Sequence, residues 1–322
     1  MSHFILAALA VVAASGAAFA QSSVSLTGKL RFAYGDAKAT TGVKTTGVGV
    51  TDGDWNIAAV EDLGGGLKAG ANMSQRLRGR DAATDAISGA SATDGNGARP
   101  RDSSMYLTGG FGTVTVGAVE AGNGILGLVT AGGPTYIGLD NNVQLAGASN
   151  VDILQYTSPA MNGFSFKAAT LDAVGGGGSQ NGGALTVYGA NYANGPVSAA
   201  LDVTKYGSSF AATANSRTRI SANYNLGVAI VGAGYQNADN GAAAAKKETA
   251  ISVSAPFGAF NVGAVYATSK TDGTPGNNTG YDLSAQYNLS KRTYVALQAQ
   301  STKAAGATAS ATNTRVQLAH SF

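Results

Sequence analysis

Apolar and polar residues alternate with a period of two along much of the chain. The alternation is clear in residues 24–32, 67–74, 197–204 and 281–288, where apolar side chains occupy nearly every second position. An amphipathic helix would need apolar residues three and four positions apart, and these segments lack that spacing. The pattern therefore predicts β-strands with one apolar face and one polar face.

Short and long connections separate the predicted strands in turn. Short turns lie at 62–65, 109–112, 159–163, 193–196, 225–227, 256–258 and 289–291. Long polar stretches lie at 36–53, 79–102, 120–149, 172–183, 206–216, 237–246, 269–279 and 302–312. Seven turns and eight long connections predict sixteen strands, and an even strand number is typical of bacterial outer-membrane barrels.

The composition of the two strand faces favours a membrane barrel over a soluble sandwich. The apolar face is rich in Ala, Val and Tyr, and the opposite face is small and polar. Lipid can cover the first face, while a water-filled lumen accepts the second. Backbone groups in lipid must all be hydrogen-bonded, so the sheet has to close on itself. The sequence predicts an all-β, 16-stranded antiparallel transmembrane β-barrel with short periplasmic turns and long extracellular loops.

The first twenty residues have the pattern of an export signal. An apolar run at 4–14 precedes the small-residue sequence Ala18-Phe19-Ala20, which is an A-x-A cleavage site. The run is too short to span a bilayer comfortably, because a membrane helix needs about 20 apolar residues. We therefore expect a signal peptide at 1–20, a barrel at 21–322 and export from the cytoplasm.

The composition excludes several classes of function. The chain has no Cys, and its two histidines, His3 and His320, lie at opposite ends. Disulfide scaffolds, Cys-ligated metal centres and a Ser-His-Asp centre are therefore not expected. A net charge of +3 is too small to suggest a nucleic-acid partner. The sequence predicts neither an enzyme nor a cofactor or metal site.

Several sequence blocks resemble one family. The blocks lie in order at 23–31, 61–69, 107–114, 156–159, 163–164, 288–293 and 320–322. Together they resemble the general trimeric porins of Gram-negative outer membranes, in the proteobacterial branch that includes neisserial and Comamonas-type porins. The resemblance implies an outer-membrane homotrimer in contact with lipid and lipopolysaccharide. Phe322, on an amphipathic last strand, resembles the signal that is read by the outer-membrane assembly machinery.

The resemblance also implies a narrowed pore with charged walls. In the family the third long loop folds into the barrel, and wall cations face it. That loop is expected at about 120–149, with Glu120 and Asp140 as its only acids. The candidate pore-lining residues are Lys29, Arg31, Arg76, Tyr106, Glu120, Asp140, Arg219 and Arg315. Alternation places the cations of this set in the lumen, and a lipid-facing Arg at mid-membrane would cost about 2–4 kcal/mol.

This chain departs from the family at several cation positions. Where the family commonly has Arg or Lys, this chain has Asp54, Ala58, Thr115, Ala118, Gln155 and Ala319. Fewer fixed cations mean a weaker field in the constriction, so strong anion selectivity is not expected. Five arginines, Arg76, Arg78, Arg80, Arg99 and Arg101, flank the second long stretch. They suit lipopolysaccharide phosphates, a neighbouring protomer, or pairing with Asp81, Asp85 and Asp102, and solvation with local pairing is favoured.

The function expected from these observations is a general diffusion porin, which passes ions and small hydrophilic solutes down their gradients. A substrate-specific porin is the main alternative, and a surface adhesin is a weaker one. Three aromatic residues, Trp55, Tyr281 and Tyr287, fit a girdle at the membrane interface.

Overall fold

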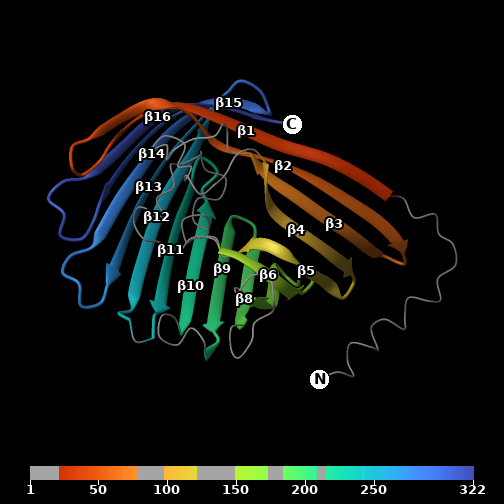
Figure 1. Cartoon of the computed structure of the whole chain (residues 1–322). Helices are drawn as coiled ribbons and strands as arrows, with labels where there is room; N and C mark the ends of the chain where they lie inside the picture. The colour runs from red at the N-terminus through yellow and green to blue at the C-terminus, as the bar shows by residue number, and fades with distance from the viewer. Residues whose placement is uncertain (1–21, 78–97, 122–148, 173–183, 209–214, 242) are drawn as a thin grey trace.

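A computed structural model describes residues 22–77, 98–121, 149–172, 184–208, 215–241 and 243–322. These residues form sixteen strands (Figure 1). The strands are β1 (Ser22–Lys38), β2 (Lys44–Gly64), β3 (Leu67–Leu77), β4 (Ala98–Gly109), β5 (Gly112–Ala121), β6 (Ser149–Thr157), β7 (Phe164–Asp172), β8 (Ala184–Asn194), β9 (Val197–Tyr206), β10 (Ser216–Asn225), β11 (Ile230–Asp239), β12 (Lys246–Phe257), β13 (Phe260–Thr271), β14 (Asn278–Asn288), β15 (Thr293–Lys303) and β16 (Ala311–Ser321).

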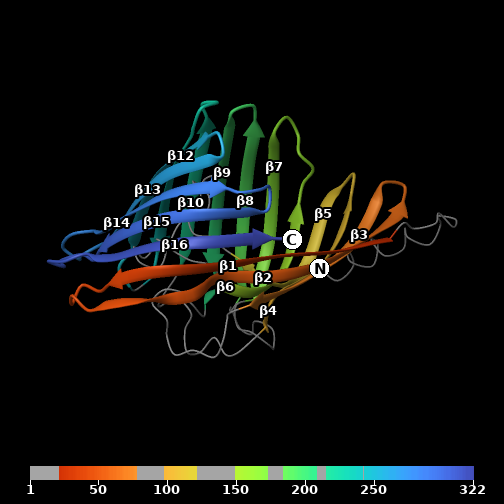
Figure 2. The same cartoon turned by 90° about the horizontal axis from the view of Figure 1, so that it is seen from above.

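Each strand pairs antiparallel with its sequence neighbours, and β1 pairs with β16 to close the barrel. Figure 2 shows β16 running beside β1 at this seam. The predicted closed sixteen-stranded antiparallel barrel is confirmed. Among the described residues, no helix is long and apolar enough to cross a membrane. The expected signal peptide at 1–20 lies outside the described residues.

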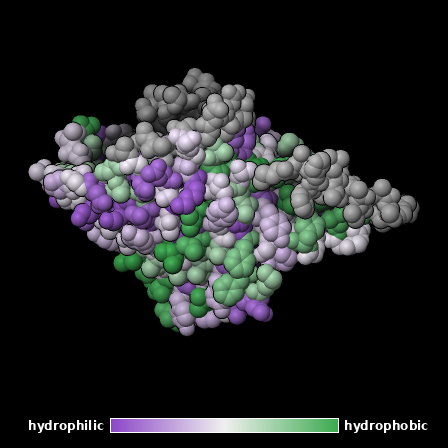
Figure 3. Space-filling view, turned by 90° about the horizontal axis from the view of Figure 1, so that it is seen from below, coloured by the Kyte–Doolittle hydropathy of each residue, from purple (hydrophilic) through white to green (hydrophobic). Residues whose placement is uncertain are grey.

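The period-two pattern separates an apolar outer face from a polar inner face. On β10 and β12, exposed and buried positions alternate, with Ile220, Ile251 and Val253 on the exposed side. Figure 3 shows hydrophobic residues in patches over the surface, beside an area of hydrophilic residues. This is the arrangement expected when lipid covers the outside of a barrel.

Aromatic side chains on the outer face lie near both ends of the strands. The rings of Phe260 and Tyr287 are 4.7 Å apart near one end, and Tyr281 lies six residues along β14 from Tyr287. That separation is about 20 Å along the strand. Tyr281 and Tyr287 are both exposed. Their positions fit aromatic bands at the two interfaces of a membrane.

The short turns lie where the sequence predicts them, but two long connections differ. The connection predicted at 79–102 ends early, because β4 begins at Ala98. The predicted loop at 36–53 is wrong, because β1 continues to Lys38 and β2 begins at Lys44. Residues 45–53 are Gly, Thr, Val and Asp, which look like loop residues in composition. They still alternate in register with β1, as in the pairs Tyr34↔Val48 and Asp36↔Thr46. Strand pairing therefore overrides local composition here.

A small apolar cluster lies on the inner face of β6, β7 and β8. Val151, Ala169, Leu171 and Leu185 are buried there, and Tyr206 packs against them. The same faces are polar or charged further along, as at Lys167. This is the part of the inner wall where apolar side chains gather among the described residues.

The seam is completed by Phe322. Its amide donates to the carbonyl of Gly28 at 2.9 Å, and its carbonyl accepts from the Gly28 amide at 3.0 Å. The ring lies against Gly28, because a Cβ built on Gly28 would be 2.3 Å from the ring atom Cζ. Gly28 thus leaves the space that the last side chain fills.

Candidate functional site

Charged side chains on the inner face gather over β1 to β5. Lys29 and Arg31 lie on the inner side of β1, opposite the exposed apolar residues Leu30 and Phe32. Their side chains are 29% and 25% exposed, so they are in contact with solvent without projecting freely into it. The inner wall of β1 therefore carries two cations at neighbouring inward positions.

The adjacent strand β2 supplies carboxylates directly opposite these cations. The register pairs Lys29 with Asp54 and Arg31 with Asp52. The Lys29 Nζ lies 3.2 Å from Asp54 Oδ2 and 2.9 Å from Asp52 Oδ2. Arg31 Nη1 lies 3.1 Å from Asp52 Oδ2. Opposite charges at facing positions of an antiparallel pair stabilise the register.

Arg101 joins the carboxylates of three strands. Its Nη1 donates to Asp54 on β2 at 2.8 Å, and its Nε lies 3.2 Å from Glu120 on β5 and 3.6 Å from Asp102. Arg101 and Asp102 on β4 stand opposite the single residue Ser74 on β3. This two-against-one arrangement is a β-bulge. Pro100, which cannot donate to the ladder, precedes the bulge, as is usual for Pro in strands. The bulge turns Arg101 into the lumen although its alternation predicts an outward side chain.

Glu120 belongs to the wall, which corrects the sequence-based expectation. It was predicted within the third long loop, but it lies on β5, past the last β4–β5 pair. Its carboxylate accepts from Arg76 Nη2 at 2.6 Å and lies close to Arg101. Its amide donates to Asp102 at 2.7 Å. Glu120 therefore neutralises wall cations instead of facing them from a loop.

These residues form one network, which we call the β1–β5 cluster. Its members are Lys29, Arg31, Arg76, Arg101, Asp52, Asp54, Asp102 and Glu120. Four cations and four carboxylates give a formal charge of zero at neutral pH. Their side chains are 19–33% exposed. A solute that passes this wall meets both signs of charge side by side.

A second ion pair network spans β7 to β10. Lys167 Nζ lies 2.6 Å from Asp202 Oδ1, and Arg219 Nη2 donates to Asp202 Oδ2 at 3.1 Å. The Asp202 and Arg219 side chains are only 8% and 7% exposed, whereas Lys167 is 26% exposed. We call these three residues the β7–β10 cluster.

Gly189 makes the contact between Lys167 and Asp202 possible. It lies on β8, paired on one side with Lys167 and on the other with Asp202. A Cβ at Gly189 would be 2.3 Å from Lys167 Cε and 2.7 Å from Asp202 Oδ1. The lysine therefore crosses a strand through the space that a missing side chain leaves.

The inner wall from β9 to β16 is polar, and many of its side chains are buried. Gln236, Gln298 and Gln317 are at most 1% exposed, as are Glu248 and Asp282. Arg315, a predicted pore-lining residue, donates from Nε to Gln298 Oε1 at 2.5 Å. Buried polar groups need such partners because their desolvation is costly.

The other predicted residues have different surroundings. Tyr106 lies on the inner face of β4, and its ring covers Gly70, since a Cβ there would be 2.3 Å from Tyr106 Cζ. Asp140, Arg78 and Arg80 lie outside the described residues. The structure thus brings Lys29, Arg31, Arg76 and Glu120 together with Arg101, while Arg219 and Arg315 stand on other strands.

Sequence comparison decides the family. A model of the Gram-negative porin family matches residues 7–307 of the chain. The chain belongs to the Gram-negative porins. The expected family and the outer-membrane location are therefore confirmed.

A curated relative agrees with this assignment. Outer membrane porin protein 32 of Delftia acidovorans is 31% identical over 258 residues. The match covers 70% of this chain and 66% of the relative, so just under two thirds of that protein's length is matched.

Solved structures share the fold at low sequence identity. A loop-deletion mutant of OmpT, an outer membrane protein of Vibrio cholerae, has a TM-score of 0.67 at 13% identity, covering 94% of this chain and 99% of that one. A triple mutant of the Rhodopseudomonas blastica porin has a TM-score of 0.65 at 16% identity, covering 93% and 100%. These likenesses support the barrel architecture of the porin.

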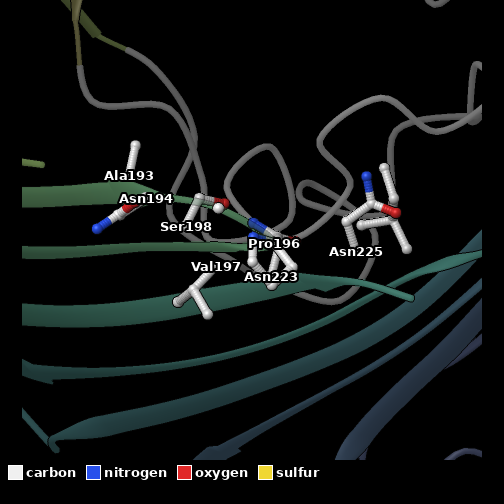
Figure 4. A pocket seen from close by; sticks show the side chains of 9 residues that line it. Ala193, Asn194, Pro196, Val197, Ser198, Asn223 and Asn225 are labelled. Atoms are coloured by element: carbon white, nitrogen blue, oxygen red, sulfur yellow. The ribbon is translucent and has the colours of Figure 1, made fainter. Parts of the chain in front are cut away.

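The porin also has a small pocket near the short turns. No charged side chain lines this pocket. Its volume is about 370 Å³. Figure 4 shows the polar side chains Asn194, Ser198, Asn223 and Asn225 around it, on β8, β9 and β10. Amide and hydroxyl groups bind water and small polar solutes alike, so this pocket gives no basis for selecting one solute.

Proposed function

We propose that the porin is a general diffusion channel, which passes ions and small hydrophilic solutes passively through its lumen. The observation that carries the proposal is the β1–β5 cluster, a partly exposed inner wall in which cations and carboxylates are paired. Such a wall offers hydrogen bonds and hydration to polar solutes of either sign. It presents no single, deeply buried binding group that would hold one solute.

The paired charges further support weak ion selectivity. A fixed cation attracts anions over about one Debye length, which is about 10 Å at 0.1 M salt. Asp54, which stands at a position where the family commonly carries a cation, lies between Lys29 and Arg101 and cancels part of their field. We therefore expect a small preference for anions, carried mainly by Lys167, the most exposed member of the β7–β10 cluster.

We also propose that the third long connection folds into the barrel and narrows it. The chain leaves β5 at Ala121 and returns at Ser149, and the intervening residues lie outside the described part. The apolar cluster on β6 to β8 supports the proposal, because apolar side chains on a water-facing inner wall need a cover. This connection starts and ends beside that cluster.

The assembly that we propose is a homotrimer in the outer membrane. Apolar side chains at the outer face of β1 and β2 support a protein contact there. Val24, Leu26 and Val48 are 74%, 61% and 68% exposed in the single chain. A neighbouring copy can cover such side chains as well as lipid does.

The direct test is planar-bilayer recording on the refolded mature protein, with the reversal potential measured across a salt gradient. Conductance steps in groups of three with a small anion preference are the expected result. Strong anion selectivity would contradict the paired-charge argument. Correctly folded barrels that conduct no ions would refute the channel itself and favour a surface adhesin.

A substrate-specific porin is the second candidate. Saturable block of the ion current by one solute would favour it, whereas flux that rises linearly with concentration for many solutes supports general diffusion. The measurement uses the same bilayers, with sugars, amino acids and dicarboxylates added to one side.

We propose that Phe322 acts in assembly, both as part of the signal read by the assembly machinery and as the residue that completes the seam. Substituting Phe322→Ala removes the ring and keeps the backbone pair with Gly28, while Gly28→Val fills the space that the ring needs. If the ring is needed only for closure, both variants should slow refolding into bilayers equally. If it is also a signal, Phe322→Ala should lower outer-membrane levels in cells further than Gly28→Val.

A further inference from the structure

An aromatic ring lies flat on the inner wall of β3 and β4. Tyr106 on β4 is paired with Gly70 on β3. A Cβ built on Gly70 would lie 2.3, 2.4 and 2.6 Å from the Cζ, Oη and Cε1 atoms of Tyr106. Because these three distances are nearly equal, the ring covers Gly70 with its face and not with its edge. Packing an aromatic ring on a glycine of the next strand stabilises the sheet where a side chain is missing.

The second face of the Tyr106 ring is turned to the lumen. Tyr106 faces inward, because its neighbours along β4, Met105 and Leu107, are exposed on the outer face. One face of the ring lies on the backbone of Gly70, so the other face meets the water of the pore. Tyr106 is accordingly half-buried. The wall therefore offers a flat aromatic surface to a passing solute.

Uncharged polar side chains surround this ring. Asn72 and Ser104 form the next inward pair on β3 and β4. Thr115 stands opposite Tyr106 on β5, and Gln155 stands opposite Thr115 on β6. Within the described part of the chain, the Tyr106 hydroxyl and the side chains of Asn72, Ser104 and Thr115 form no hydrogen bond with the protein. We call Tyr106, Asn72, Ser104, Thr115 and Gln155 the Tyr106 platform, and its half-buried polar groups are free to bind a solute.

We propose that the Tyr106 platform binds the ring of neutral pyranose sugars in transit, so that they pass faster than open-chain polyols of similar size. A pyranose has a flat face of C–H groups and carries its hydroxyl groups around the edge. The C–H face covers the open face of the Tyr106 ring, which removes two apolar surfaces from water. The hydroxyl groups meet the amide of Asn72 and the hydroxyl of Thr115. An open-chain polyol has the hydroxyl groups without the fixed flat face.

The position of the platform fits a neutral solute that is held briefly. The nearest members of the β1–β5 cluster along the same strands are Asp102, two residues from Ser104, and Arg76, four residues from Asn72. These separations are about 7 and 13 Å along a strand. The platform lies on an open wall, so a bound sugar keeps water on its other side. Weak binding of this kind favours entry into a pore without preventing exit.

The proposal rests on the diffusion channel proposed above and names a class of solute that the channel favours. The test is osmotic swelling of lipid vesicles that contain the full mature porin, with glucose or sorbitol at equal low concentration. The measured quantity is the ratio of the glucose rate to the sorbitol rate, because this ratio cancels the number of pores in each preparation. Heat-modifiable migration on a denaturing gel checks that every variant is folded.

Two substitutions at Tyr106 separate the flat face from the hydroxyl. Tyr106→Leu keeps an apolar side chain over Gly70 and removes the face, so the ratio should fall by about twofold to fivefold. Tyr106→Phe keeps the face and should keep most of the ratio. The control is Tyr294→Leu, which removes another tyrosine of the inner wall, one whose hydroxyl accepts from Gln317 at 3.3 Å. The control should leave the ratio unchanged.

A further variant leaves the ring in place. Thr115→Val removes one hydroxyl group of the platform and does not touch the packing of Tyr106 on Gly70. The ratio should fall by about twofold, the effect of one hydrogen bond to a neutral solute. This measurement decides the proposal even if Tyr106→Leu does not fold.

The outcomes distinguish this proposal from the channel itself. Equal rates for glucose and sorbitol in the unchanged porin would overturn the sugar preference and leave general diffusion intact. Equal falls in Tyr106→Leu and Tyr294→Leu would also overturn it, because the effect would then not belong to the platform. Folded barrels that pass neither solute would refute the diffusion channel.

Discussion

The β1–β5 cluster and the inner wall from β9 to β16 are both polar, but they differ in their contact with water. Charged side chains of the first are 19–33% exposed, whereas Asp202, Arg219, Glu248 and Asp282 on the second are at most 8% exposed. The first wall can therefore act on a passing solute. The second serves mainly to hold the strands together.

The difference matters because ion pairs depend on their surroundings. An exposed pair contributes about 0–1 kcal/mol to stability, since water solvates both partners when it breaks. Removing one partner of a buried pair leaves a charge without compensation and costs about 3–5 kcal/mol. Similar residues on two walls of one barrel should thus lose different amounts of stability on substitution.

The largest expected effect is on stability, at Asp202. In Asp202→Leu, the buried Arg219 loses the carboxylate that it donates to, and Lys167 loses the same ion-pair partner. The free energy of unfolding should therefore fall by about 3–5 kcal/mol. Urea titration of the folded porin in lipid vesicles, followed by tryptophan fluorescence, measures this. A loss below 1 kcal/mol would show that the β7–β10 cluster is as solvated as the β1–β5 cluster.

An intermediate effect is expected from Gly189→Val, which changes no charge. The added side chain overlaps Lys167 and Asp202, so Lys167 should move into the lumen. We expect a loss of about 1–3 kcal/mol in stability, and a twofold to fourfold rise in anion over cation permeability.

A glycine without neighbours provides the control for Gly189→Val. No heavy atom outside the adjacent residues lies within 4 Å of a Cβ built on Gly110, in a short turn, so Gly110→Val should change neither quantity. If both variants behave alike, the substitution acts through the backbone and not through Lys167.

The smallest effect on stability, at Asp54, should accompany a clear change in selectivity. Asp54→Asn removes one carboxylate that lies between Lys29 and Arg101, on a wall in contact with water. Stability should change by less than about 1 kcal/mol. The anion-to-cation permeability ratio should rise about twofold to fourfold at low salt, because one unit charge at about 10 Å in water contributes about 0.4 kcal/mol. The increase should disappear in 1 M salt. Reversal potentials at both salt concentrations provide the measurement.

The sequence alone predicts the fold well, because a barrel in lipid repeats one simple rule. Alternating residues such as Leu26 and Thr27 need opposite environments, and closed pairing is the arrangement in lipid that satisfies the backbone. The exception at 36–53 has a physical cause. Loop-like composition carries little information when a neighbouring strand already offers hydrogen bonds.

The candidate site is less predictable, since it depends on contacts across strands. Alternation places Lys29 and Arg31 on the inner face, and the register then explains Asp52 and Asp54. Arg101 could not be placed by alternation because a bulge reverses it, although Pro100 is a visible signal of a bulge. No local pattern connects Lys167 with Asp202, which lie on strands separated by β8.

Gly189 has a consequence for how the permeability of this porin can evolve. A single base change in a glycine codon can yield alanine or valine, and either side chain would disturb the Lys167–Asp202 contact. A population exposed to a toxic anion, or short of a nutrient anion, could therefore alter uptake through a residue that carries no charge. Comparing natural variants for polymorphism at this position would reveal selection that a survey of charged residues alone would overlook.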